Sequence, residues 1–146
     1  MARITVSVNS QKLSIQEAVS AISDSGCGGQ VFFCGTVRSH NKGRQVEGIF
    51  YDAHTSLAEK VLSDICESVS SGCSGAVNIY VAHRTGYVAA GDASIIIAVS
   101  SEHRADAFKM AREIIEEIKA KVPVWKREHY TDGQSRWLEG SSIREF

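Results

Sequence analysis

The fold is decided by Ala93-Ser94-Ile95-Ile96-Ile97-Ala98-Val99-Ser100, a stretch that is nearly all apolar. An almost unbroken apolar run of this length is typical of a central strand that is buried on both faces. Its strongly apolar part, 95–99, is far shorter than the ~20 residues that a membrane-spanning helix needs. We therefore expect a sheet with this strand at its centre.

The secondary structure of the segments on either side is predicted from the period of their apolar residues. Helices are predicted from about Ser14 to Ile22, from Ser56 to Val69 and from about Arg104 to Lys121, where Pro123 stops the last one. Alternating apolar residues predict strands at 3–8, 30–38, 45–53, 77–81, 124–130 and 135–138. This order, with no repeat or linker, predicts one compact α+β domain over 1–146, with a mostly antiparallel sheet and about three helices on one side.

Two details of the predicted sheet come from residues 30–53. Gly35 lies inside the strand 30–38, where a glycine often marks a bulge or a close backbone approach. The strand 45–53 follows a short polar loop, so we expect it to be the hairpin partner of 30–38. Cys34 lies inside the apolar run and is expected in the core.

Composition excludes several classes of function. The 146 residues carry 16 Lys+Arg against 17 Asp+Glu, a formal charge of −1, which does not favour binding along nucleic acid or an anionic membrane. Any anion site must be local. The cysteines form no C-x-x-C pair and the histidines no H-E-x-x-H, so a metal site is not indicated. The first residues lack the apolar core of a secretory signal, and we expect a cytoplasmic protein.

The helix over 104–121 places Lys119 at the border of its apolar face. At about 100° per residue, Lys119 lies only about 20° from Phe108. The apolar stripe that includes Phe108 also contains Ala111, Ile115, Ile118 and Val122. A lysine at this border either extends its charge to water or points into a partly desolvated pocket. Desolvation would favour the neutral amine, which can act as a base or nucleophile.

Lys126 follows Pro123 by three residues, on a strand that leaves the end of the same helix. Both ammonium groups can therefore converge on one cleft, an arrangement that suits an anionic substrate and a proton-transfer step. The alternative is that Lys126, Arg127 and Glu128 are solvated charges of an edge strand.

Further basic residues stand at the ends of predicted elements. His103 and Arg104 lie where a strand passes into a helix, a position at which backbone N–H groups and an arginine can bind phosphate. Arg38 ends the strand 30–38, and His83-Arg84 ends the strand that begins at Val77. Each can also be a cap, a surface arginine or a turn, but together they indicate a phosphate-binding cleft.

Four motifs, read in this order and at these spacings, closely resemble the large, catalytic subunit family of molybdopterin synthase. They are Phe33-x-Gly35-x-Val37-Arg38, His83-Arg84-x-Gly86, His103-Arg104-x-x-Ala107-Phe108 and Lys119-x-x-x-Pro123-x-Trp125-Lys126-x-Glu128. The resemblance extends from about Phe33 to Trp137, and its last motif is highly specific. It implies a compact domain with a hammerhead-like elaboration.

The resemblance also implies the activity and the partners. It implies sulfur transfer to cyclic pyranopterin monophosphate, which gives the dithiolene of molybdopterin during molybdenum cofactor biosynthesis. In this family the sulfur arrives as a thiocarboxylate on the C-terminal Gly-Gly of a small ubiquitin-like subunit, whose tail threads into the large subunit. Two large subunits pair centrally, each with a small subunit at its outer end, which makes a heterotetramer around a homodimer. The resemblance implies no metal or redox cofactor. The cysteines need not take part, because the sulfur is imported.

Carried over by motif, Lys119 and Lys126 are the catalytic pair. Lys119 is expected to act as acid, base or transient nucleophile, and Lys126 to position the thiocarboxylate or the anion. The substrate and the tail are expected to be bound by residues of which some reach across the dimer, namely Thr36, Val37, Arg38, His103, Arg104, Arg127 and Glu128.

The sequence departs from the family pattern at two places, which concern the binding of the substrate phosphate. Tyr51-Asp52 stands where relatives more often have Tyr-Glu, and Gly140-Ser141 stands where relatives can carry an arginine, which leaves Arg144 as a possible substitute.

Two other hypotheses about the function remain. A non-catalytic adaptor would bind a ubiquitin-like tail or a phosphorylated ligand in the same cleft. A cysteine-dependent enzyme would need an activated thiolate, and no cysteine has a histidine or lysine neighbour in sequence.

Overall fold

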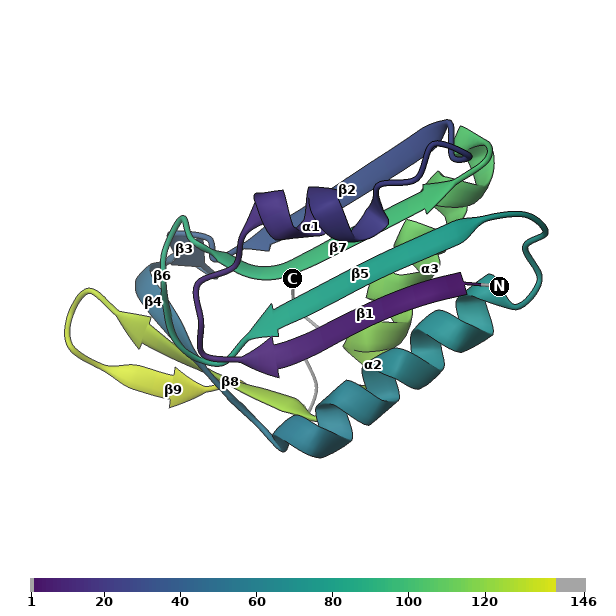
Figure 1. Ribbon diagram of the computed structural model, residues 1–146. Coiled ribbons are helices and arrows are strands. Elements are labelled where there is room, and N and C mark those ends of the chain that lie inside the picture. Colours follow the sequence, from purple (N-terminus) through teal and green to yellow (C-terminus); the bar gives the residue numbers. More distant parts are fainter. Residues whose placement is uncertain (1, 139–146) are drawn as a thin grey trace.

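A computed structural model describes residues 2–138. The chain forms two sheets, and the larger one has fewer but mostly longer strands. Its strand order is β1-β5-β7-β2, and it contains β1 (Ala2–Asn9), β5 (Val77–Arg84), β7 (Ala93–Ser101) and β2 (Gly29–Thr36). The pair β1 and β5 is parallel, and the other two pairs are antiparallel (Figure 1). From Ser94 to Ser101 every residue of β7 is buried, which confirms the prediction of a central strand.

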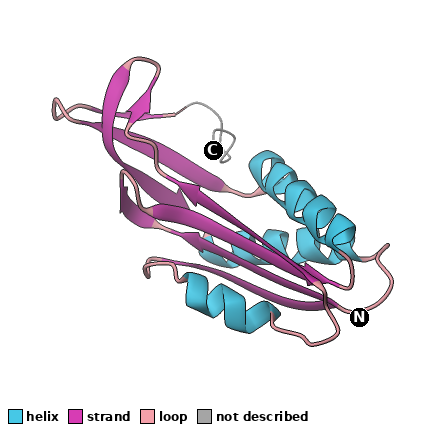
Figure 2. Cartoon of the chain, turned by 90° about the horizontal axis from the view of Figure 1, so that it is seen from above, coloured by secondary structure: helices cyan, strands magenta, loops and turns pink. Residues whose placement is uncertain are grey.

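Helices cover both faces of this sheet (Figure 2). The helix α1 (Ile15–Ile22) packs on β5 and β7 from one face. The helices α2 (Thr55–Ser70) and α3 (Arg104–Lys121) pack on the other face, α2 against β1 and α3 against β7 and β2. The prediction that all helices share one side is therefore wrong. A strand that is apolar on both faces needs cover on both, and α1 supplies the second layer.

The smaller sheet contains β3 (His40–Asn41), β4 (Arg44–Ala53), β6 (Gly86–Ala89), β8 (Val124–Tyr130) and β9 (Ser135–Trp137). Strand β4 pairs with β8 on one side and with β3 and β6 on the other. The predicted hairpin of 30–38 with 45–53 is not formed, because the chain leaves the first sheet after Thr36 and enters the second. The predicted bulge at Gly35 is confirmed, since the register shifts between Gly35 and Thr36.

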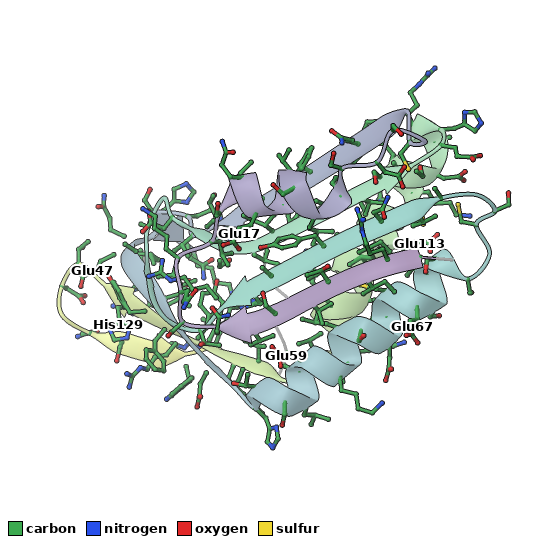
Figure 3. All side chains as sticks on the ribbon, in the orientation of Figure 1. Glu17, Glu47, Glu59, Glu67, Glu113 and His129 are labelled. Carbon is green, nitrogen blue, oxygen red and sulfur yellow. The ribbon has the colours of Figure 1, made fainter. Side chains whose placement is uncertain are left out.

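The main core lies between the first sheet and the pair α2 and α3 and continues into the smaller sheet, and a smaller apolar cluster lies under α1. A polar contact fixes α2 against the edge of the sheet. The carboxylate of Glu59 points toward the end of β1 (Figure 3) and accepts a hydrogen bond from the Val8 amide at 3.0 Å. Among the described helices, none has the length and apolar character to cross a membrane.

Two burial predictions are wrong, and both concern the edge formed by β2 and α3. Phe108 is 63% exposed, although the predicted stripe placed it in the core. The buried stripe of α3 consists of Ala107, Met110, Ala111, Ile114 and Ile118. Cys34 is also exposed, because β2 is the outermost strand and α1 packs on β5 and β7.

The centre of β7 should dominate stability. Ile97 is fully buried in the main core, so Ile97→Ala should lower the free energy of unfolding by about 2–5 kcal/mol. Val19 is 42% exposed on α1, and Val19→Ala should cost less than about 1 kcal/mol. Urea denaturation of both variants measures the difference. Equal losses would contradict the assignment of β7 as the central strand.

Candidate active site

The strand β8 places two charged residues inside the protein. Its residues alternate in burial, so that Val124, Lys126, Glu128 and Tyr130 are buried on one face. Lys126 and Glu128 are each only 4% exposed. Both line a small cavity next to Tyr51 of β4, where the two sheets meet. Buried charges are costly unless they are compensated, so this pair marks a special site.

Neighbouring side chains hold the Glu128 carboxylate from two directions. The Asn41 amide Nδ2 donates to Oε2 at 2.9 Å, and the Tyr130 hydroxyl donates to Oε1 at 2.8 Å. Burial, together with the Glu128 carboxylate, raises the pKa of Tyr130. Tyr130 therefore remains a hydrogen-bond donor at neutral pH, and it fixes Glu128 beside Lys126.

The segment that follows β2 forms another wall of the same cavity, with Thr36, Val37 and Arg38. Val37 is tied to the loop between β6 and β7, since its amide donates to Asp92 O at 3.0 Å and its carbonyl accepts from the Gly91 amide at 2.8 Å. These bonds bring Arg38 to the lysine and the carboxylate of β8. The bulge at Gly35 turns the chain toward this position.

The cavity is narrow, with a volume of about 20 Å³, which holds about one water molecule. A wider hollow of about 280 Å³ adjoins it and shares Asn41, Glu128 and Leu138 with it. The outer part of this hollow is basic, with Lys42, Arg44 and Arg136. A positively charged mouth therefore leads to a narrow inner space beside Lys126.

Two further buried side chains lie at the inner end. The sequence singled out Tyr51 only at a departure from the family pattern, and His83 only in a family motif and as one of several basic residues of a phosphate-binding cleft. Tyr51 is 2% exposed and His83 is 1% exposed, and their rings meet edge to face with centroids 5.1 Å apart. Burial raises the pKa of Tyr51 to about 12, a hydrogen bond with Ser94 opposes this, and the Glu128 charge adds to it. Burial lowers the pKa of His83 to about 4, the hydrogen bond to the Arg84 carbonyl opposes this, and the Lys126 charge adds to it.

The predicted site residues fall into two groups. Those that line the narrow cavity are Thr36, Val37, Arg38, Lys126 and Glu128. Lys119 is half-buried near the end of α3 and is not part of the lining of the narrow cavity or its mouth. Arg127 lies on the opposite face of β8 from Lys126, between the rings of Phe50 and Trp137.

His103 and Arg104 lie far from Lys126 within one chain. They line a separate hollow of about 400 Å³ with Gly28, Glu102 and Ala105. This hollow is at the first turn of α3, whereas Lys126 follows its last turn, and an 18-residue helix spans about 27 Å. One chain therefore presents two basic sites. The departures at Gly140, Ser141 and Arg144 lie outside the described residues, and Asp52 is exposed on β4.

Other chemistry finds little support among the described residues. Within 2–138, no group of three or more His, Cys, Asp or Glu side chains is placed to hold a metal ion. Burial raises the pKa of Cys66 to about 12 and also raises the pKa of Cys73, so both are poor thiolates at neutral pH. The fold and the cavity thus define an α+β protein with a buried lysine and carboxylate, suited to binding an anion and moving a proton.

Comparison with known proteins agrees with this class. Residues 8–121 match the family model described as MoaE protein. A curated relative, molybdopterin synthase catalytic subunit 1 of Mycobacterium tuberculosis, is 41% identical over 131 residues, which are 88% of this chain and 86% of that protein. The catalytic subunit of Taeniopygia guttata is 39% identical over 134 residues, covering 92% and 86% of the two chains.

Solved structures show the same fold. The crystal structure of molybdopterin synthase from Staphylococcus aureus superposes with a TM-score of 0.86 at 31% identity, and the match covers 92% of this chain and 96% of that one. The complex of subunits 1 and 2 of molybdopterin-converting factor from Helicobacter pylori has a TM-score of 0.71 at 19% identity, over 95% and 92% of the chains. The chain therefore belongs to the MoaE protein family.

The buried histidine should make stability depend on pH. His83 is neutral in the folded protein down to about pH 4, whereas an unfolded histidine takes up a proton near pH 6.5. The contribution of the neutral His83 to the free energy of unfolding is thus complete above pH 6.5. It is lost as the pH falls toward 4, by roughly 3 kcal/mol. Urea denaturation between pH 7 and 4 should show a smaller loss for His83→Gln than for the wild type. Parallel pH curves for the two proteins would be the contrary result.

Proposed function

We propose that this chain is the catalytic subunit of a molybdopterin synthase, which transfers sulfur to cyclic pyranopterin monophosphate during molybdenum cofactor biosynthesis. The observation that carries the proposal is the narrow cavity beside Lys126 and Glu128, reached through a basic mouth, in a member of the MoaE family. The curated relatives are named as catalytic subunits of this enzyme.

The sulfur donor that fits this cavity is the C-terminal Gly-Gly thiocarboxylate of a small ubiquitin-like subunit. The cavity is narrow, so a chain end made of glycine, which has no side chain, suits it better than a residue with a branched side chain. Arg38 and Lys126 supply positive charge for the terminal anion. A partner subunit is named in the Helicobacter pylori complex, which has the same fold.

The two lysines divide the chemistry. In each transfer, the thiocarboxylate sulfur forms a bond to a substrate carbon as an oxygen leaving group departs with a proton. Water then hydrolyses the acyl–sulfur bond, which leaves the sulfur on the pterin and a carboxylate on the carrier. Lys126 holds the thiocarboxylate, and Lys119 acts as acid, base or transient nucleophile. Glu128 keeps the charge of the inner site balanced.

A second copy of the chain would complete the site, and β2 offers a surface for it. Residues Gly29–Thr36 form an open edge of the larger sheet and contain neither a charge nor a proline. Such an edge is prone to pair with another strand. Phe32 is 38% exposed on this strand, which a subunit contact would cover.

The exposed side of α3 continues the same surface. A groove runs between α3 and α2, and Glu117 and Lys121 of α3 line it. The helical period then places Phe108, Ile115 and Lys119 on the opposite side of α3, above β2. An antiparallel pairing of β2 with its copy would set the first turn of one α3 beside the last turn of the other. His103 and Arg104 of one chain would then approach Lys119 and Lys126 of the other.

We also infer that the reaction takes place in the cytoplasm. The cysteines Cys27, Cys34, Cys66 and Cys73 are all free, as expected in a reducing compartment. Because the sulfur comes from the carrier, none of these thiols is needed as the donor.

Removal of the inner lysine should abolish turnover without loss of the fold. Lys126→Ala should lower dithiolene formation at least about a hundredfold in an assay with thiocarboxylated small subunit and cyclic pyranopterin monophosphate. Lys109→Ala is the matched control, since Lys109 is exposed on α3 and pairs only weakly with Glu113 at 3.9 Å. Normal turnover in Lys126→Ala or in Lys119→Ala would contradict the assignment. Weaker small-subunit binding at unchanged maximal turnover would favour the adaptor.

Two inactive variants should restore each other if the site is shared between copies. Lys126→Ala and Arg104→Ala, unfolded and refolded together in equal amounts, form mixed dimers with one intact site each. About a quarter of wild-type activity should return, since half of the dimers are mixed and half of their sites are intact. A Phe108→Asp variant should shift the protein toward the monomer in sedimentation. No recovery on mixing, with a stable dimer present, would refute the shared site.

A further inference from the structure

We propose that His83 is a positioning residue for Lys126, which keeps the lysine ammonium at the inner end of the cavity through a neutral, fixed imidazole. The expected effect on turnover rests on the proposed function, whereas the placement of the Lys126 side chain by His83 rests on geometry alone. The motif His83-Arg84-x-Gly86 has no role in the reaction described above, yet its histidine is one of the largest side chains that are fully buried in the described fold.

The orientation of His83 is fixed by its own strand end. Its Nδ1 lies 2.8 Å from the Arg84 carbonyl oxygen. A carbonyl oxygen only accepts hydrogen bonds, so Nδ1 carries the proton and Nε2 keeps a lone pair. The register on both sides, His83 with Val8 and with Ile95, holds the backbone in the middle of the larger sheet. The ring therefore has one tautomer and little freedom.

Tyr51 connects this ring to the lysine. Tyr51 is the direct partner of Lys126 in the antiparallel pair of β4 and β8, and it lines the narrow cavity with Lys126. Its ring meets the imidazole edge to face at 5.1 Å. Directly opposed residues of neighbouring strands lie within about 5.5 Å of each other. The three side chains therefore form one packed group, with His83 innermost.

The charges around this group favour a neutral imidazole and a charged lysine. The cations that face the cavity are Lys126 and Arg38, and the carboxylate that faces it is Glu128. The Lys126 charge disfavours a second positive charge on His83. A neutral ring with a lone pair instead stabilises an ammonium group, as a buried hydrogen-bond acceptor does. An apolar side chain of the same size would fill the space but would not stabilise the ammonium group.

The direct test follows the Lys126 ammonium group by ¹⁵N NMR of lysine-labelled protein, with the signal assigned by its loss in Lys126→Arg. His83→Phe keeps the ring but lacks the nitrogen atoms, whereas His83→Gln keeps one donor and one acceptor. His129→Phe is the matched control, because His129 lies on the smaller sheet (Figure 3), on the other face of β8 from Lys126. The signal should move or vanish in His83→Phe and persist in the other two variants.

Kinetics give a second measurement. His83→Phe should lower kcat about tenfold or more, with KM for the small subunit within about threefold, since the lysine is misplaced but the mouth is unchanged. His83→Gln should recover most of kcat. An unchanged Lys126 signal in a folded His83→Phe variant would overturn the inference even if the enzyme is active. A shifted signal in a chain without sulfurtransferase activity would support the inference and refute the proposed function.

Discussion

The site depends on the burial of one lysine at the junction of two sheets. A charge on Lys126 inside the protein is compensated by Glu128, which β8 places in the same cavity and whose carboxylate Asn41 and Tyr130 fix. The strand acquires this orientation at Pro123, where α3 ends and the chain turns into the smaller sheet. The core of the larger sheet, centred on β7, provides the rigid support against which these polar groups are held.

The larger sheet also separates the two basic sites of one chain. Its strand β2 begins beside Arg104, since a Cβ atom on Gly29 would lie 2.8 Å from the Arg104 Cα, and it ends at the wall formed by Thr36. One strand of eight residues thus spans about 26 Å between the two basic sites. The dimer that we propose, with two-fold pairing along this edge, would bring the two sites together and would also cover the apolar surface around Phe108 and Phe32.

Much of this fold could be predicted from local pattern. The bounds of α3 and β8 agree with the prediction, because a proline and a clear change of period mark them. The strand β6 was not predicted, since four residues give too little alternation to detect. The burial of Lys126 and the exposure of Phe108 depend on which elements pack together, and sequence alone did not provide that. The burial of His83 against Tyr51 could not be predicted for the same reason, whereas the specific spacing around Pro123 was enough to indicate the family.

The central claim is that the space beside Lys126 receives the end of the sulfur carrier. Photo-crosslinking tests it most directly, with a photoreactive residue directly before the C-terminal Gly-Gly of the small subunit and mass spectrometry to locate the attachment. The account predicts crosslinks within 36–51 and 126–138, the segments that contain the lining of the cavity and its mouth. Attachment confined to the groove between α2 and α3, at Val61 and Glu117, would contradict it.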